Sequence, residues 1–211
     1  MANLDAAFGC RPTKHLNGHP WNGQAMKMWY DGSSSTAVFI GDPVYLIGDA
    51  CAKGCCPGFR VATAGGDTGY HPWVGAVVGI EPSTATSLPK LAGSTTGYAN
   101  VTVDPFLLYE IQADETAVIG AASVGLNAVF IAGAGSTITY LSGFELDSGA
   151  ATAPAVAGYY QMMIWAAVER EDNDIALVNA KWLVLNSFHQ LHSFAVKATD
   201  TTDAVCGLIG R

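Results

Sequence analysis

TAVFIGDPVYLIG at residues 36–48 and WVGAVVGIEP at residues 73–82 are the two stretches that decide the fold class of this chain. Both are short runs rich in Val, Ile and aromatic residues, and both are interrupted by turn-forming residues, which is typical of strands joined by tight turns. Asp42 can close an Asx-type turn, and Pro43 lacks the N–H that a helix interior needs. We therefore predict a pair of strands around residues 41–43 and a buried strand that ends at Pro82.

The rest of the chain repeats this pattern of short strands and Gly-rich turns. A partly alternating pattern predicts a half-buried strand over residues 106–112, and residues 130–141 are typical of a hairpin whose turn lies at 132–135. Further strands are expected over 61–64, 159–168 and 181–185, with an acidic turn at 169–174. A single short helical turn is expected, within residues 117–129. These expectations define an all-β protein, either a barrel or a sandwich.

The first thirty residues differ from the remainder because they show neither a helical nor a strand period. A segment of this kind cannot bury itself, so we predict an extended arm that lies on its own chain or on a neighbouring subunit. Large aromatic residues are favoured interface anchors. We also expect that a chain lacking residues 1–30 keeps a folded body. The candidate contact residues of the arm are Phe8, Arg11, His15, Trp21, Trp29 and Tyr30.

The composition limits the classes of partner. Hydrophobic residues make up 50% of the 211 residues and charged residues only 13%, against roughly 25% charged residues in ordinary soluble domains. Such a surface is expected to be rich in small polar residues or to meet other protein. The net charge of −8 argues against nucleic acid as a partner. There is no uninterrupted apolar run of about 18 residues, and we expect neither a membrane partner nor a secretory signal.

Five cysteines occupy positions 10, 51, 55, 56 and 206, and three of them form a C-x3-C-C cluster. Cys51, Cys55 and Cys56 have no second pair at zinc-site spacing, so we predict no metal site. Free thiols in a loop are the favoured interpretation. A disulfide from Cys51 to a neighbouring cysteine, or to another chain, is the alternative, because adjacent Cys55 and Cys56 can bond to each other only with strain.

The other reactive residues form no recognisable catalytic arrangement. His189 and His192 are three positions apart, which places them on opposite faces of a strand, and no Glu follows as in zinc proteases. The acidic turn at 169–174 lacks the ligand pattern of a calcium loop. Gly133 and Gly135 precede neither a helix nor a Lys, so a phosphate loop is excluded. We predict no enzyme, no cofactor and no metal.

The order of the motifs resembles that of the capsid decoration, or cement, proteins of tailed bacteriophages. The resemblance is carried by seven segments that span nearly the whole chain and contain no catalytic residues. The cysteine loop at 51–56 departs from the ordinary Gly/Pro turn of that pattern. The segments are MANLDAAFGCRPTKHLNGHPWNG at 1–23, FIGDPVYLIG at 39–48, WVGAVVGIEP at 73–82, LLYEIQAD at 107–114, VGLNA at 124–128, GAGSTITYLSGFEL at 133–146 and NAKWLVLNSFHQL at 179–191.

The resemblance implies a structural role. Such proteins bind the major capsid protein on the outer face of the expanded shell and hold neighbouring capsomers together against internal DNA pressure. It implies a small β-barrel of the β-tulip or SH3-like type, with an arm at 1–30, a body at 31–211 and an inserted β subdomain around 83–158. A homotrimer is favoured over a dimer, and the location is the virion exterior after synthesis in the host cytoplasm. The alternative is a virion-surface module that binds glycan or the host.

Overall fold

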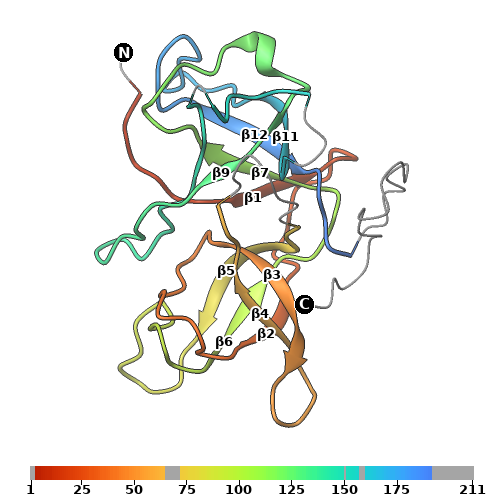
Figure 1. The fold of residues 1–211 in the computed structure, drawn as a ribbon, viewed down its shortest axis with the longest axis vertical. Coiled ribbons are helices and arrows are strands. Elements are labelled where there is room, and N and C mark those ends of the chain that lie inside the picture. Colours follow the sequence, from red (N-terminus) through yellow and green to blue (C-terminus); the bar gives the residue numbers. More distant parts are fainter. Residues whose placement is uncertain (1–2, 65–71, 150, 157–159, 192–211) are drawn as a thin grey trace.

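The computed structural model describes residues 3–64, 72–149, 151–156 and 160–191, and these are built almost entirely from β-strands. The strands form two units that are stacked along the long axis of the molecule (Figure 1). The all-β class and the small closed barrel predicted from the sequence are therefore confirmed. In these described parts of the chain, the helical structure is the single 3-10 turn η1 (Ala121–Ser123), and no helix is long and apolar enough to cross a membrane.

The lower unit in Figure 1 is a closed barrel of five strands. The order around the ring is β2 (Met26–Tyr30), β4 (Pro57–Val61), β3 (Pro43–Ala50), β5 (Gly75–Glu81) and β6 (Gly97–Val101). The ring closes because β2 pairs antiparallel with β6 on one side and parallel with β4 on the other. Alternate side chains point inward and fill the barrel, with Tyr30, Phe59 and Val77 completely buried.

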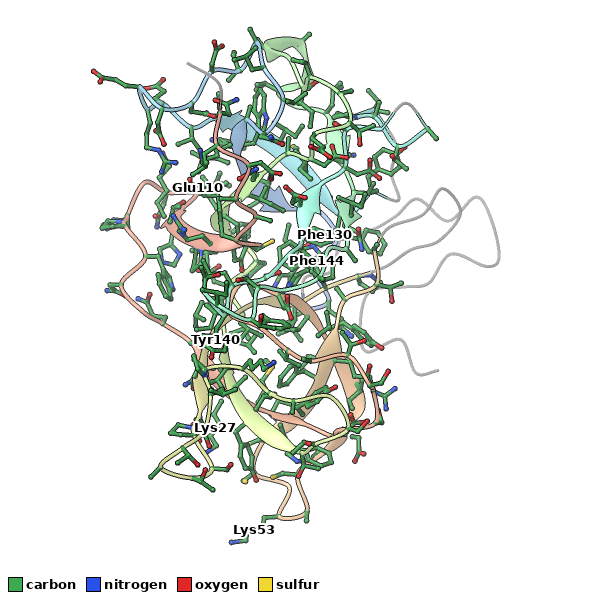
Figure 2. The ribbon with its side chains drawn as sticks, turned by 90° about the vertical axis from the view of Figure 1, so that its left-hand side faces the viewer. Lys27, Lys53, Glu110, Phe130, Tyr140 and Phe144 are labelled. Atoms are coloured by element: carbon green, nitrogen blue, oxygen red, sulfur yellow. The ribbon has the colours of Figure 1, made fainter. Side chains whose placement is uncertain are left out.

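The upper unit is a five-stranded antiparallel sheet with a short two-stranded ribbon beside it. The sheet order is β1 (Arg11–His15), β7 (Leu107–Gln112), β12 (Lys181–Asn186), β11 (Met162–Ala167) and β8 (Asn127–Ala128). The ribbon is formed by β9 (Phe130–Ile131) and β10 (Glu145–Leu146). One face of the sheet packs on a second apolar core, in which Phe130 and Phe144 meet edge to face at 5.8 Å between ring centroids (Figure 2).

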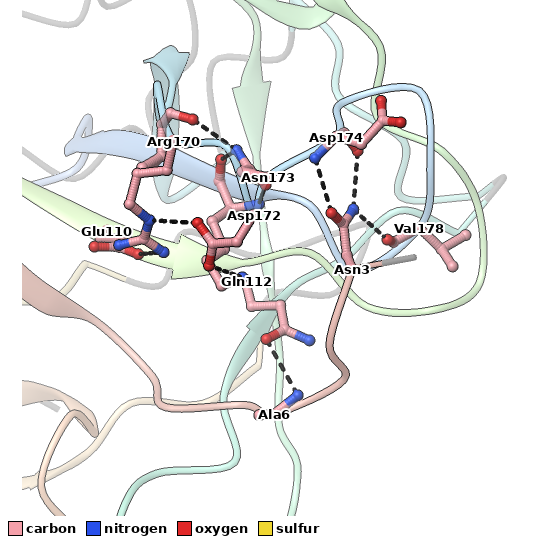
Figure 3. Close-up of polar contacts among 11 residues, drawn as sticks. Asn3, Ala6, Glu110, Gln112, Arg170, Asp172, Asn173, Asp174 and Val178 are labelled. Atoms are coloured by element: carbon pink, nitrogen blue, oxygen red, sulfur yellow. Dashed lines mark hydrogen bonds and ion pairs between the residues drawn. The ribbon is translucent and has the colours of Figure 1, made fainter. Parts of the chain in front are cut away.

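Strand β7 is buried along its whole length, so the prediction of a half-buried strand at 106–112 is wrong. Tyr109 and Ile111 face the apolar core, and Glu110 and Gln112 point to the other face. That second face is covered as well: Arg170 pairs with Glu110 at 2.9 Å, and Gln112 Oε1 accepts the N–H of Ala6 at 3.3 Å (Figure 3).

The chain connects the two units differently from the predicted domain plan. The barrel uses residues 26–101 and is inserted between β1 and β7, which are neighbours in the sheet. The predicted separate arm at 1–30 is wrong, because β1 is a strand of the sheet and β2 closes the barrel. The predicted insertion around 83–158 is also misplaced, because residues 107–146 contribute strands to the sheet unit rather than to a subdomain of their own.

Two consecutive residues, Trp73 and Val74, join the units at their cores. Val74 is buried inside the barrel and donates its N–H to Val44 O at 2.7 Å. The side chain of Trp73 points the opposite way and is completely buried in the core of the sheet unit, 5.3 Å from the Tyr109 ring and 5.1 Å from the Phe130 ring. Its indole N–H donates to Gln161 O at 3.0 Å, so the polar atom of this large side chain is also satisfied.

Asp42 caps the turn at residues 41–43 with its side chain, as expected from the sequence. Gly41 adopts a positive φ of 96°, and the buried Asp42 carboxylate accepts the N–H of Phe39 at 2.8 Å. Pro43 then begins β3. Residues before the turn form isolated bridges, Val38 with Leu91 and Ile40 with Leu141, instead of the predicted first strand. The second stretch forms β5, which ends before Pro82 as predicted.

Truncation of Trp73 is expected to destabilise both units together. Trp73→Ala removes a fully buried indole that contacts aromatic rings of the sheet core, so the free energy of unfolding should fall by about 3–5 kcal/mol. Trp165→Ala is the matched control, because Trp165 lies on β11 and is 43% exposed. Urea unfolding followed by circular dichroism measures both. Equal midpoints for the two variants would show that the indole does not hold the cores together.

The buried Asp42 carboxyl makes stability depend on pH. Burial raises its pKa from 3.8 to about 6. Because the pKa is raised in the folded state, the neutral Asp42 carboxyl contributes to the free energy of unfolding. That contribution is fully present below pH 3.8 and is lost as the pH rises through about 6. Asp42→Asn keeps an acceptor for the Phe39 N–H and cannot ionise. Relative to the wild type, D42N should gain about 2–3 kcal/mol in unfolding free energy between pH 4 and pH 7.5. Urea midpoints of both proteins at the two pH values test this; parallel pH profiles would contradict it.

Candidate interaction surface

The N-terminal segment lies on its own chain and is fixed at its start. The Asn3 side chain donates to the carbonyls of Asp174 and Val178, both at 2.8 Å, and its Oδ1 accepts the N–H of Asp174 at 2.8 Å (Figure 3). These three bonds tie residue 3 to the loop before β12. The segment then crosses the sheet unit toward the barrel.

The segment crosses the turn before β3 at a close contact between Gly9 and Gly41. Cys10 donates its N–H to Gly41 O at 2.8 Å. A Cβ at either glycine would overlap backbone of the other strand, and both residues have a positive φ, so glycine is required on both sides. The crossing buries Phe8, and the guanidinium of exposed Arg11 lies 4.4 Å from the centre of the Phe8 ring.

Trp21 lies between two shallow hollows at the level where the units meet. It is half-buried, and its indole N–H donates to Gln24 O at 3.1 Å. On one side is a hollow of about 170 Å³ that also has Phe8, Arg11, Ile40, Val78 and Leu141 on its walls. On the other side is a hollow of about 260 Å³, bordered by Met26, Leu107 and the ion pair in which His15 Nδ1 lies 2.8 Å from Asp104 Oδ2.

A loop at residues 136–141 projects from the side of the molecule (Figure 1). Its last residue, Leu141, lies on the wall of the first hollow. The loop is held by its own backbone: Ser136 N donates to Leu141 O at 2.9 Å, and Tyr140 N donates to Ser136 O at 3.0 Å. The Ser136 hydroxyl oxygen accepts the N–H groups of Ile138 and Thr139 at 3.2 and 3.0 Å. The base is fixed to the barrel, since Ser142 N donates to Ile40 O at 2.8 Å.

The projecting loop presents Ile138 to solvent. Its side chain is 87% exposed, although its own N–H and those of Thr139 and Tyr140 all donate to Ser136. Tyr140, at the level where the units meet in Figure 2, adopts a positive φ of 58° that turns the chain back toward Leu141. The loop ends at Leu141, which lies on the wall of the first hollow together with Trp21. We call this area the junction surface; it comprises Arg11, Trp21, Ile40, Val78, Ile138 and Leu141.

The junction surface has the chemistry of a contact site. Cys10 lies on the wall of the first hollow, and burial raises the pKa of its thiol well above the usual value, so the thiol stays protonated and weakly nucleophilic. Asp104 is engaged on both oxygens, because Oδ1 accepts the N–H of Phe106 at 2.8 Å while Oδ2 faces His15. Apolar walls beside one exposed guanidinium suit protein–protein contact.

The structure divides the predicted contact residues into two groups. Phe8, Arg11, His15 and Trp21 gather around the two hollows. Tyr30 is completely buried inside the barrel, and its hydroxyl lies 2.9 Å from Thr36 O as a donor, so its prediction as a subunit contact is wrong. Trp29 is a half-buried residue of the barrel wall that pairs with Tyr98.

The remaining candidates, Cys51, Cys55 and Cys56, lie far from the junction surface. They occupy the loop between β3 and β4 at the free end of the barrel, where Lys53 marks the tip in Figure 2.

The projecting loop was missed because residues 136–141, STITYL, are rich in β-branched residues and predict a strand. The structure forms β9 and β10 at residues 130–131 and 145–146 instead, so the predicted hairpin turn at 132–135 is wrong. The available signal was Ser136, whose hydroxyl can accept the N–H groups of the following residues in a turn. The structure also requires glycine at position 135, because a Cβ there would overlap the Phe39 ring.

Comparisons with family models, curated proteins and solved structures find no match for this chain.

Deletion of residues 1–30 is now expected to abolish cooperative folding, in contrast to the expectation from the sequence. The deletion removes β1 from the sheet and opens the barrel by removing β2. The control is Trp21→Ala, which removes a surface side chain, keeps both strands and should lower the unfolding free energy by no more than about 2 kcal/mol. Circular dichroism during urea titration measures both. A sharp transition in the deleted chain would contradict the strand assignments.

Proposed function

We propose that this chain is a structural protein of a tailed-phage head, which binds the outer face of the capsid and holds neighbouring capsomers together. Two independent lines support the proposal: the order of sequence motifs resembles that of capsid decoration proteins, and the fold provides a contact surface at the junction of two β units. The observation that carries it is the projecting loop at 136–141, which holds an exposed Ile138 in a fixed conformation.

The physical basis is pre-organisation. Ile138 is available to enter an apolar pocket, and full burial of a side chain of this size stabilises a complex by about 1.5–3 kcal/mol. Because the hydrogen bonds from Ser136 N to Leu141 O and from Tyr140 N to Ser136 O already fix the loop, docking orders little additional backbone. One such contact is weak by itself. Its strength on a shell comes from repetition, since a trimer presents three copies and each added contact is intramolecular.

The charge distribution agrees with adhesion to protein. Only 13% of the residues are charged, and the net charge is −8. Arg11 at the edge of the first hollow is held over Phe8 and remains exposed, so it can pair with an acidic group of a partner. In this proposal, apolar contacts at Ile138 and Trp21 supply affinity, and Arg11 supplies orientation.

The decisive variant is Ile138→Asp, with Val156→Asp as its matched control. Both positions carry exposed β-branched residues, at 87% and 92%, but Val156 lies outside the junction surface. Binding is measured by sedimenting heads assembled without this chain from the major capsid protein of the same phage, followed by quantification of the bound chain. I138D should weaken binding at least tenfold, because a carboxylate cannot enter an apolar pocket. V156D should bind like the wild type.

Two outcomes of this experiment would count against the proposal at different levels. If I138D occupies heads as fully as the wild type, the projecting loop is not the contact. If the wild-type chain itself fails to bind heads, the decoration function is wrong. Equal urea midpoints for I138D, V156D and the wild type will show that any loss of binding does not come from unfolding.

A further inference from the structure

Three cysteine thiols converge at the free end of the barrel, in the loop between β3 and β4. Cys51 Sγ lies 3.0 Å from Cys55 Sγ, and Cys55 Sγ lies 3.7 Å from Cys56 Sγ. All three sulfur atoms lie within 4.8 Å of one another. The sequence argument against a metal site relied on the missing second pair of cysteines, and it did not anticipate that one loop would bring three sulfur atoms together.

The backbone of the loop produces this convergence. Cys51 N donates to Cys56 O at 3.1 Å, which closes the loop, and Gly54 N donates to Cys51 O at 2.7 Å. Gly54 adopts a positive φ of 65°, which allows the tight reversal after Lys53. The chain direction therefore changes between Cys51 and Cys55, so that the side chains of Cys55 and Cys56 are brought to the same side as Cys51.

The loop also prepares Cys51 to carry a negative charge. The N–H of Cys55 points at Cys51 Sγ at a distance of 3.2 Å. Lys27 of β2, which pairs with Glu81 of β5, and Tyr98 of β6 are ionisable groups close to the cluster, and Lys53 lies in the loop itself. The Lys27 ammonium is 4.3 Å from the centre of the Tyr98 ring.

We propose that Cys51, Cys55 and Cys56 together bind one soft divalent cation of the zinc class through three thiolate ligands. Zinc–sulfur bonds of about 2.3 Å in tetrahedral geometry place sulfur atoms about 3.8 Å apart. The Cys55–Cys56 separation of 3.7 Å already fits this value, and the Cys51–Cys55 separation has to widen by less than about 1 Å. Cys55 is exposed, so its side chain is free to make that adjustment.

A bound cation accounts for the position of Cys56 beside the other two cysteines, whereas a disulfide between Cys51 and Cys55 does not. A disulfide between Cys51 and Cys55 would use two sulfur atoms and leave Cys56, which is buried beside them, without a role. Thiolates are the preferred ligands of soft metals, and a cation also neutralises the repulsion among them. Binding replaces three thiol protons, which pass to the buffer, with three metal–sulfur bonds.

The test is a titration of the reduced full chain with Zn²⁺ and, separately, with Cd²⁺. One equivalent of Zn²⁺ is expected to bind with release of protons, and affinity should rise with pH because all three thiols must lose their protons to bind the metal. Cd²⁺ should produce thiolate-to-metal charge-transfer absorption at the same stoichiometry. Cys51→Ser, Cys55→Ser and Cys56→Ser should each weaken binding at least tenfold. Cys206→Ser is the control and should bind like the wild type.

Several results would overturn the proposal. These are the absence of stoichiometric Zn²⁺ binding, unchanged binding in C56S, or a loss in C206S as large as that in C56S. If a serine variant does not fold, the wild type alone decides the question by alkylation of its thiols with and without Zn²⁺, followed by peptide mapping. Zn²⁺ must then protect Cys51, Cys55 and Cys56 together; protection of only two of them would contradict a three-thiolate site.

Discussion

The insertion of the Trp73 side chain from the barrel into the core of the sheet unit is the interaction on which the architecture depends. Residues 73 and 74 point in opposite directions, so one short stretch belongs to two cores. The backbone around Trp73 also bonds to both units. Asn186 Nδ2 and Gln190 N donate to Trp73 O at 3.0 Å, while the next N–H, of Val74, donates to Val44 O of the barrel. The Gln190 side chain exchanges two hydrogen bonds with the backbone of Leu46, at 2.7 and 2.9 Å, which extends this connection to β3. The relative position of the two units is thus fixed by buried contacts.

The topology makes such a connection necessary. The barrel is inserted between β1 and β7, and its first and last strands begin and end side by side, with Met26 paired to Val101. An insertion whose ends are adjacent can form its own ring without disturbing the host sheet, in which β1 and β7 still pair. The two chain crossings between the units would by themselves permit relative motion. Trp73, together with the close approach of Gly9 and Gly41, supplies the packed interface that opposes it.

The parts of this fold that the sequence predicts are those decided by local chemistry. The strands at 75–81 and 181–186, the turn at Asp42 and the scarcity of helix follow from β-branched residues, proline and glycine within a few positions. The pairing of Met26–Tyr30 with both β4 and β6 does not follow from local chemistry, because ring closure depends on residues as distant as Val101, 75 positions after Met26. The burial of β7 on both faces escaped prediction for the same reason: its polar face is covered by Arg170 and by the N-terminal segment. At the candidate site, sequence reasoning found Phe8, Arg11, His15 and Trp21, and it missed the loop beside them.

The projecting loop is the feature that folding alone does not explain. Ile138 is 87% exposed and so buries little apolar surface. Ser136 and Tyr140, which fix the loop, use their hydrogen bonds to hold a solvent-exposed turn. Tyr140 also carries the left-handed backbone conformation that non-glycine residues rarely adopt. Order without burial is unfavourable for stability, since the conformational entropy lost is not offset by apolar contact. The same order is favourable for binding, because a partner then meets a surface that is already shaped. The position of the loop beside the hollow at Trp21 and Leu141 gives that partner a larger contact than one side chain. This is why we propose that adhesion, if the chain is a decoration protein, uses the junction of the two units and not either unit alone.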